Sequence, residues 1–383
     1  MRLSSRVSAA AESRTLGLSA RVARLRAEGR DVVSLLEGEP DLPVPASVLR
    51  ATEDALLAGQ TRYSASAGLP ELRAAIARKL DAVNGVPACA DGVLVTNGAK
   101  QALYEILQTL CGPGDEVVVL SPYWVTFPEA VKLAGARPIV VETKDGVLDV
   151  DAVGRALSPN TRAVIVNSPN NPTGAVYPAE SLRALATLAD EHDFFIIADE
   201  AYEALVYEGA THVSAASLGR QAAARTVTLQ TFSKSFAMTG YRVGFAAGPE
   251  ELIRAAGRLH GHVTGNVCTF AQRGALAALE LGQPHRDAWR AEHQARRDVA
   301  FALASPLFHL EKPRGALFLW ADARRRFDGR RSDSARFAED LLERAGVAVV
   351  PGSACGREGF LRLSFCRPES VLREAFRRIE EAL

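Results

Sequence analysis

Short runs of hydrophobic and β-branched residues recur along the middle of the chain, without strict alternation of apolar and polar positions. Strands that are covered on both faces of a sheet show this pattern, whereas strands with one solvent-exposed face alternate. We therefore predict seven buried strands, at residues 93–96, 117–120, 139–142, 163–167, 194–198, 226–229 and 243–247.

Between several of these runs, apolar residues recur at the spacing of an α-helix. Residues 100–110 and 178–192 each place their leucines on one stripe, with Pro178 at the start of the second helix and glycines after the first. Alternation of strands and helices predicts a mostly parallel sheet between helices, which is an α/β fold.

The two ends of the chain follow a different pattern. An arm, a helix and a turn-rich loop come first, and the C-terminal part reads as helix, short strands and helix, at residues 285–303, 317–321, 347–350, 361–365 and 369–383. We predict an N-terminal arm and small-domain segment at 1–45, a large domain at 46–280 and a small α+β domain at 281–383.

Composition excludes some partners. Lys and Arg together number 45, as do Asp and Glu, so we expect no nucleic-acid or acidic membrane partner. No apolar run approaches the roughly 20 residues of a membrane helix, and the N-terminus lacks the apolar core of a secretory signal.

Five cysteines without a Cys-x-x-Cys pair fit a reducing compartment, so we expect a cytoplasmic protein. His260 and His262 have no partner cluster in sequence, and we expect no metal.

Ligands of open parallel sheets bind beyond the carboxyl ends of the strands, so the residues that follow each strand are candidates. Gly98, Ala99 and Lys100 form a turn into a helix N-terminus, which suits a phosphate, although an ordinary turn fits equally well. Trp124 follows the next strand and is either a flat ligand-binding face or a core residue. The rigid SPNNPTG turn presents Asn171 at its centre.

Charged residues follow two further strands. Asp199 ends a buried run, where a carboxylate is costly unless it meets a cation or caps a helix. Lys234 follows the hydroxyl groups of Thr231 and Ser233, with Arg242 eight residues later. A buried lysine with a lowered pKa can condense with an aldehyde, and the guanidinium fork suits a phosphate.

Elimination also favours Lys234, because only Lys100 and Lys234 among the six lysines follow strands, and Lys100 opens an exposed-looking helix. A phosphate cradle, an aromatic face, an amide, a carboxylate, a lysine and an arginine are together the groups that pyridoxal phosphate requires.

At this point the chain resembles the class I/II pyridoxal-phosphate aminotransferases of fold type I, in the branch that is similar to aspartate aminotransferase. The resemblance covers nearly the whole chain, through GEPD, TRYSASAGLPELRAAIA, GAKQAL, SPYWVTFPE, NSPNNPTGAVY, ADEAYEALVYEG, SKSFAMTGYRVGF, VAVVPGSACG and GFLRLSF. It implies a large domain with a mostly parallel seven-stranded sheet between helices, and a smaller α+β domain.

The resemblance also implies residue roles. Lys234 would hold the cofactor and move the substrate proton, Asp199 would pair with the ring nitrogen, and Tyr202 would hold the phenolic oxygen. The implied cofactor-binding residues are Gly98, Ala99, Lys100, Trp124, Asn171, Asp199, Tyr202, Thr231, Ser233, Lys234 and Arg242, with Tyr63 reaching the neighbouring subunit of a homodimer. The implied substrate-binding residues are Thr15, Gly38, Trp124, Asn171 and Arg362, and the implied cis bonds are Ser121–Pro122 and Asn171–Pro172.

The implied reaction is ping-pong transfer of an amino group between an L-amino acid and a 2-oxo acid. Ser13, Thr15 and Lys100 match positions that bind a side-chain carboxylate, which favours aspartate or glutamate as one partner. Glu37 and Arg14 depart from the usual pattern, and an acidic Glu37 leaves open a biosynthetic transaminase for a basic or polar amino acid. Lyases, decarboxylases and cyclising enzymes share this fold and also stay open.

Overall fold

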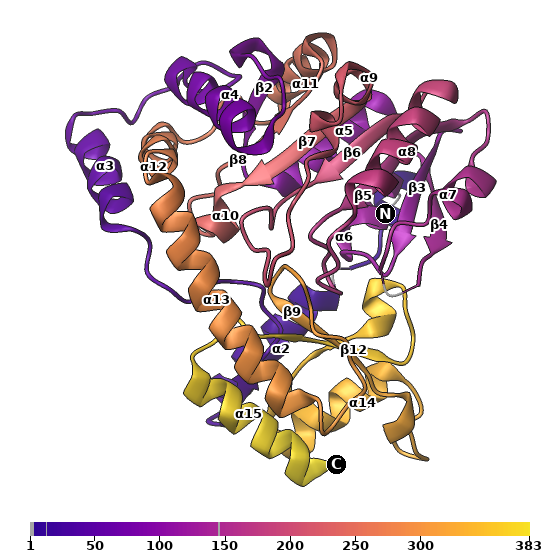
Figure 1. Ribbon diagram of the computed structural model, residues 1–383. Helices are drawn as coiled ribbons and strands as arrows, with labels where there is room; N and C mark the ends of the chain where they lie inside the picture. Colours follow the sequence, from indigo (N-terminus) through magenta and orange to yellow (C-terminus); the bar gives the residue numbers. More distant parts are fainter. Residues whose placement is uncertain (1–3, 13, 145) are drawn as a thin grey trace.

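A computed structural model describes residues 4–12, 14–144 and 146–383, and its upper part in Figure 1 is built on a seven-stranded sheet. The strand order is β2-β8-β7-β6-β5-β3-β4; β8 pairs antiparallel with β2 and β7, and the other pairs are parallel. The strands are β2 (Val93–Thr96), β3 (Glu116–Ser121), β4 (Arg137–Glu142), β5 (Thr161–Asn167), β6 (Phe195–Asp199), β7 (Thr226–Thr231) and β8 (Gly244–Ala247).

Both faces of this sheet are covered by helices, which explains the missing alternation in the sequence. Val117 and Val119 of β3 pack in one core cluster, whereas Val118 and Leu120 pack in the cluster on the opposite face. The first face is covered by α5 (Ala99–Leu110), α6 (Thr126–Leu133) and α11 (Glu250–Val263), and the second by α7 (Val150–Ala156) and α8 (Ala179–Glu191).

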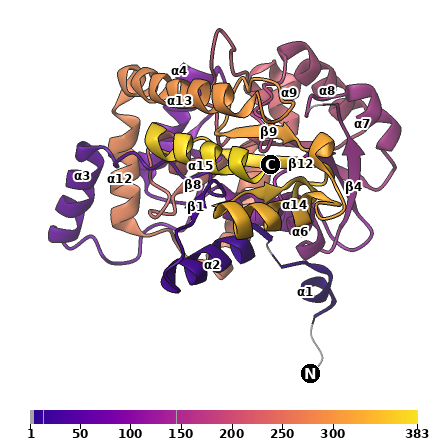
Figure 2. The same cartoon turned by 90° about the horizontal axis from the view of Figure 1, so that it is seen from below.

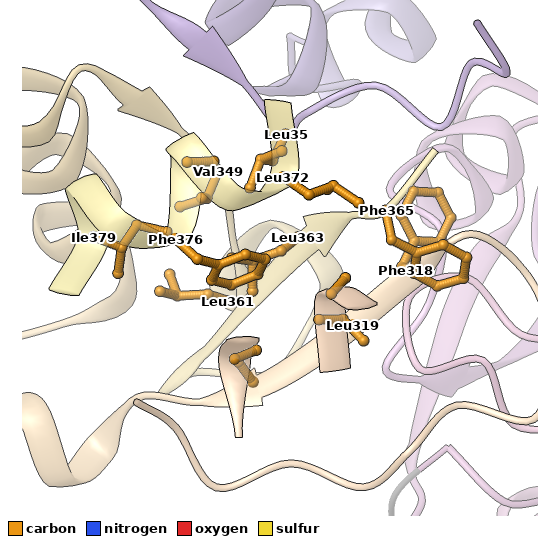
Figure 3. Close-up of a cluster of buried hydrophobic side chains, with 14 of the residues drawn as sticks. Leu35, Phe318, Leu319, Val349, Leu361, Leu363, Phe365, Leu372, Phe376 and Ile379 are labelled. Carbon is orange, nitrogen blue, oxygen red and sulfur yellow. The ribbon is translucent and has the colours of Figure 1, made fainter. Parts of the chain in front are cut away.

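The lower part in Figure 1 combines the C-terminal segment with residues from the N-terminus. An antiparallel sheet, β11-β12-β9, is made by β9 (Phe318–Asp322), β11 (Val350–Pro351) and β12 (Phe360–Ser364). Its core is shared with Leu35 from the N-terminal segment and with Phe376 of α15 (Glu369–Ala382), as Figure 3 shows. The long helix α13 (Gly282–Ala304) runs between the two parts and packs against α15 in the views of Figures 1 and 2.

The remaining described helices lie around these two sheets. They are α1 (Ser5–Ala9), α2 (Arg14–Ala27), α3 (Ala46–Leu57), α4 (Pro70–Asn84), α9 (Arg220–Arg225), α10 (Phe232–Ser235), α12 (Thr269–Leu279) and α14 (Ser334–Asp340). Within the described ranges, none of the helices combines the length and the apolar character that crossing a membrane requires.

The fold class is confirmed, and all seven predicted strands exist with ends shifted by at most a few residues. One prediction was wrong: residues 347–350 form no single strand. Val347–Ala348 (β10) pairs in parallel with Val33–Ser34 (β1), and the chain then enters the other sheet as β11. The division into 1–45, 46–280 and 281–383 stays a prediction.

A second correction concerns the cis prolyl bonds. Ser121–Pro122 is cis as the resemblance implied, but the second cis bond among the described residues is Ser168–Pro169 and not Asn171–Pro172. Further along the same turn, the Asn171 backbone N–H donates a hydrogen bond of 2.8 Å to the side-chain oxygen of Asn167.

Candidate active site

A pocket of about 310 Å³ lies where the carboxyl ends of β3, β5, β6 and β7 meet the N-terminus of α5 and the C-terminal unit. Its walls combine segments from every part of the chain. They comprise Thr15, Leu16, Ser19, Leu36, Glu37, Gly38, Ala99, Lys100, Trp124, Asn167, Asn171, Asp199, Ala201, Tyr202, Thr231, Ser233, Lys234, Arg242, Phe318 and Arg362. Of the predicted site residues that the structure describes, only Gly98 and Tyr63 are absent from this wall.

One end of the pocket is shaped for an anion. Gly98 precedes α5 with a φ of +80°, and a side chain there would come within 2.6 Å of the Arg242 guanidinium. Gly244 is equally confined, because a Cβ would lie 2.7 Å from the backbone nitrogen of Ala99. Arg242 donates hydrogen bonds to the carbonyl oxygens of Thr239 and Asn97, at 2.9 and 3.1 Å. The glycines thus let a guanidinium approach the positive end of a helix, where an anion is stabilised.

Hydroxyl groups complete this end of the pocket. The Thr231 hydroxyl accepts a hydrogen bond from the Ser233 backbone N–H and lies 2.9 Å from the Ser233 hydroxyl. This arrangement caps the short helix α10, which carries Lys234.

Lys234 projects from α10 into the centre of the pocket, and its amine donates a hydrogen bond of 2.9 Å to the Gly38 carbonyl. Burial lowers the pKa of Lys234; Cys366 and Glu39 act against this shift, whereas the neighbouring cations Arg242 and Arg362 add to it. The Trp289 indole N–H donates to the Lys234 carbonyl at 2.9 Å, so helix α13 fixes the backbone from which the amine extends.

Asp199 ends β6 at the floor of the pocket. Burial raises the pKa of its carboxyl from 3.8 to about 7, against the lowering effect of the Ala201 backbone N–H, which donates to it at 3.1 Å. Glu200 raises this pKa further, and Lys234 lowers it. A cation placed against Asp199 would therefore be strongly favoured, since it would stabilise the ionised form.

Tyr202 and Asn171 lie beside Asp199. Tyr202 is buried, and burial raises the pKa of its hydroxyl while Arg362 lowers it. Asn167, at the end of β5, donates to the Asp199 backbone carbonyl at 2.9 Å and accepts from the Asn171 backbone N–H at 2.8 Å. Asn167 thus ties the turn with Asn171 to the strand with Asp199.

Arg362 extends from β12 to the pocket wall and is buried, at 5% exposure. It donates to the Asn171 side-chain oxygen at 3.0 Å and to the Leu36 carbonyl at 2.6 Å, with its guanidinium 4.3 Å from the centre of the Phe318 ring. Its Nε has no hydrogen-bond partner among the described residues although it is buried. An arginine that is held flat with one donor unused is prepared to bind a carboxylate.

Trp124, Lys100 and Thr15 also line the pocket. The Lys100 ammonium lies 5.1 Å from the centre of the Trp124 ring. Burial and the Arg242 charge lower the pKa of Lys100. Ser13, the third residue expected at a side-chain carboxylate, lies outside the described residues.

Tyr63 lies apart from the pocket, and its side chain is 96% exposed in the single chain. Sequence reasoning missed Asn167, Phe318 and Cys366. Asn167 had a usable signal because it ends a predicted strand, whereas Phe318 and Cys366 had none. Both are hydrophobic or weakly polar residues whose partners come from remote parts of the chain.

The pocket thus combines an end that suits an anion, a partly buried lysine and a buried arginine. Comparison with known proteins shows the family to which the chain belongs. The profile of the family described as aminotransferase class I and II matches residues 30–379. The chain is 44% identical to the aspartate/prephenate aminotransferase of Thermus thermophilus, across 100% of this chain and 98% of that protein. It is 38% identical to the aspartate aminotransferase of Bacillus subtilis, across 99% and 98%.

The solved structures give the same answer. The aspartate aminotransferase from Thermus thermophilus with maleate superposes with a TM-score of 0.95 at 43% identity, covering 100% of both chains. An aspartate aminotransferase from Rhizobium meliloti reaches 0.94 at 34% identity, covering 100% of this chain and 98% of that one. The chain therefore belongs to the class I and II aminotransferases and is an enzyme of the transaminase type.

The raised pKa of Asp199 predicts a pH dependence of stability. Below about pH 4 the carboxyl is protonated in both states, and between about pH 4 and 7 only the unfolded chain ionises it. The free energy of unfolding of the ligand-free protein should therefore fall as the pH rises through this window, by up to about 1.4 kcal/mol per pH unit. Above pH 7 this contribution levels off.

Urea unfolding of the wild type and the Asp199→Asn variant between pH 4 and 8 measures this contribution. The difference between the two proteins should change with pH, and Asp151→Asn, at an exposed position, should follow the wild type. Parallel stability curves for the wild type and Asp199→Asn would contradict the burial of a protonated carboxyl.

Proposed function

We propose that this pocket holds pyridoxal phosphate and transfers the amino group of aspartate or glutamate to a 2-oxo acid. The observation that carries the proposal is that Lys234, Asp199 and Arg362 all line one cavity. Relatives named aspartate aminotransferase and aspartate/prephenate aminotransferase support the choice of substrate.

The donor set fits this cofactor from end to end. The N-terminus of α5, with Gly98 and Ala99, would hold the phosphate together with Thr231, Ser233 and Arg242. A larger residue in place of Gly98 would put its Cβ against the Arg242 guanidinium. Glycine at this position therefore allows the backbone N–H groups and the guanidinium to bind the same anion. Lys100 would add positive charge for the phosphate and also for a side-chain carboxylate of the substrate.

The ring end of the cofactor meets the other predicted residues. Asp199 would pair with the ring nitrogen, and its carboxyl has a pKa that a neighbouring cation would pull down. Tyr202 and Asn171 would hold the phenolic oxygen, and Trp124 would lie against the ring face. Pyridoxal phosphate supplies an aldehyde and an electron-withdrawing ring, which stabilises negative charge at the substrate Cα.

The substrate end is defined by Arg362. Its guanidinium would bind the α-carboxylate, with Gly38 and Asn171 beside it, and would so orient the Cα–H bond toward Lys234. Lys234 is proposed to hold the cofactor in the resting enzyme and then to take the Cα proton as a neutral amine, since burial lowers its pKa. Because the same residues serve both substrates in turn, the kinetics should be ping-pong.

Lys234→Ala tests the assignment of the catalytic lysine. Borohydride reduction of the wild type should fix the cofactor mass on the peptide that carries Lys234, as peptide mass mapping would show. The variant should carry no such label, and its turnover should fall by about 10²–10⁴-fold or more. Lys144→Ala, at an exposed lysine, serves as the control and should keep both label and activity. A label on another lysine would overturn the assignment.

We further infer a homodimer in which Tyr63 reaches the phosphate of the neighbouring site. The nearly full exposure of Tyr63 and its distance from its own pocket wall support this assignment. Leu49, Leu56 and Leu57 of the nearby α3 are also exposed, as expected for a surface that a second copy covers.

All five cysteines are free, which supports the expected reducing compartment.

Mixed dimers test the placement of Tyr63. Tyr63→Phe should weaken cofactor binding, and Lys234→Ala should be inactive. If Tyr63 serves the partner's site, refolding the two variant chains together creates one intact site in each mixed dimer, so the activity of the mixture should exceed the mean of the two separate variants. Equal activity before and after mixing would contradict the proposed sharing of Tyr63 between subunits.

A further inference from the structure

The loop Leu36–Glu39 is hydrogen-bonded to both Arg362 and Lys234, the two charged residues at the substrate end of the pocket. Its Leu36 carbonyl accepts from Arg362 at 2.6 Å, and its Gly38 carbonyl accepts from Lys234 at 2.9 Å. The backbone of this loop therefore contacts both the proposed carboxylate-binding arginine and the proposed catalytic lysine, and Leu36, Glu37 and Gly38 line the pocket.

Glu37 is the residue between these two carbonyls, and it lines the pocket. Left unpaired, it would place a negative charge in the wall that a substrate side chain must approach. Its carboxylate instead accepts from the Arg367 guanidinium at 2.9 Å and from the Ser34 hydroxyl at 2.6 Å, with the Ser19 hydroxyl at 3.5 Å. The two charged side chains are only about a quarter exposed, at 28% for Glu37 and 26% for Arg367.

Arg367 itself lies behind the loop and outside the pocket wall. It follows β12, the strand of Arg362, and its Nε donates to the Ser34 carbonyl at 3.3 Å. Among the described residues that line the pocket, Arg367 bonds only to Glu37, so its effect on a substrate is separate from direct binding.

The loop has other attachments that do not involve Arg367. The Cys366 thiol lies 3.3 Å from the carbonyl oxygens of both Glu37 and Glu39, and Arg362 and Lys234 hold two further carbonyls. Removing the Arg367 charge therefore leaves the backbone of the loop attached at several points and changes mainly the charge of the wall.

The charges that remain near the substrate have one sign once Glu37 is neutralised. Arg362 and Lys100 both line the pocket, and the other acid there, Asp199, lies at the proposed ring end. A dicarboxylate fits such a wall, whereas an uncompensated Glu37 would repel its side-chain carboxylate.

We propose that Arg367 is a specificity-determining residue: by pairing with Glu37, it keeps the pocket selective for a dicarboxylic amino acid. The inference rests on the proposed function. It explains why the enzyme would prefer a dicarboxylic amino acid as its substrate. It also assigns the departure at Glu37 to a compensated charge instead of to recognition of a basic amino acid.

Two variants break the same ion pair with opposite effects on charge, which separates specificity from structural support. Arg367→Gln exposes the Glu37 charge and should lower kcat/KM for aspartate by about tenfold, chiefly through KM, while kcat/KM for alanine changes by less than about twofold. Glu37→Gln removes the acid and should raise kcat/KM for aspartate by about two- to threefold. The double variant should return to within about threefold of the wild type.

If the ion pair merely held the loop in place, both single variants would lose activity, and they would lose it toward aspartate and alanine alike. That result would overturn the inference, as would a double variant that is as poor as Arg367→Gln.

Calorimetric titration of the holoenzyme with maleate supplies a readout independent of turnover, and Arg367→Gln should weaken its binding by about tenfold. A wild type that binds maleate but does not transaminate aspartate would refute the proposed function and leave this inference standing.

Discussion

Burial of both faces of the central sheet is the constraint on which the rest of this structure depends. Each interior strand presents apolar side chains to helices on either side, so polar chemistry is possible only where the strands end. Asn167, Asp199 and Thr231 occupy three such ends on adjacent strands, and parallel pairing brings them to one edge. The C-terminal unit then covers this edge and contributes Arg362, which closes the substrate side of the cavity.

Burial at that edge also sets the electrostatics of the site. It shifts the pKa of Lys234 downward and that of Asp199 upward, so both groups are displaced toward their neutral forms. A lysine that is to react needs this shift, whereas an aspartate that is to hold a cation needs a ligand that reverses it. The same surroundings therefore prepare one residue for chemistry and the other for binding.

Much of the large unit could be predicted from sequence because its signals are local. Continuous apolar runs gave the seven strands, and the residues after each run gave most of the pocket wall. What escaped prediction depends on contacts between distant segments. The split of residues 347–350 between two sheets reflects pairing with Val33 and Arg362, which no local pattern encodes.

The same distinction holds for charge. From the sequence, Glu37 indicated an uncompensated negative charge near the substrate. Its partner Arg367 is 330 positions away, so no local pattern could reveal the pairing. The structure pairs the two residues, so the pattern at Glu37 alone no longer argues for a basic substrate. Cys366 was read only as a free thiol, yet it lies against the carbonyls of the loop that contacts Lys234 and Arg362.

A single-turnover half-reaction tests the central claim most directly. The purified holoenzyme is mixed with excess aspartate in the absence of any 2-oxo acid, and oxaloacetate and ammonia are measured together. Our account predicts about one oxaloacetate per active site and no free ammonia, with the amino group recovered when a second 2-oxo acid is added. Continued release of ammonia beyond one equivalent per site would show elimination chemistry and contradict the account.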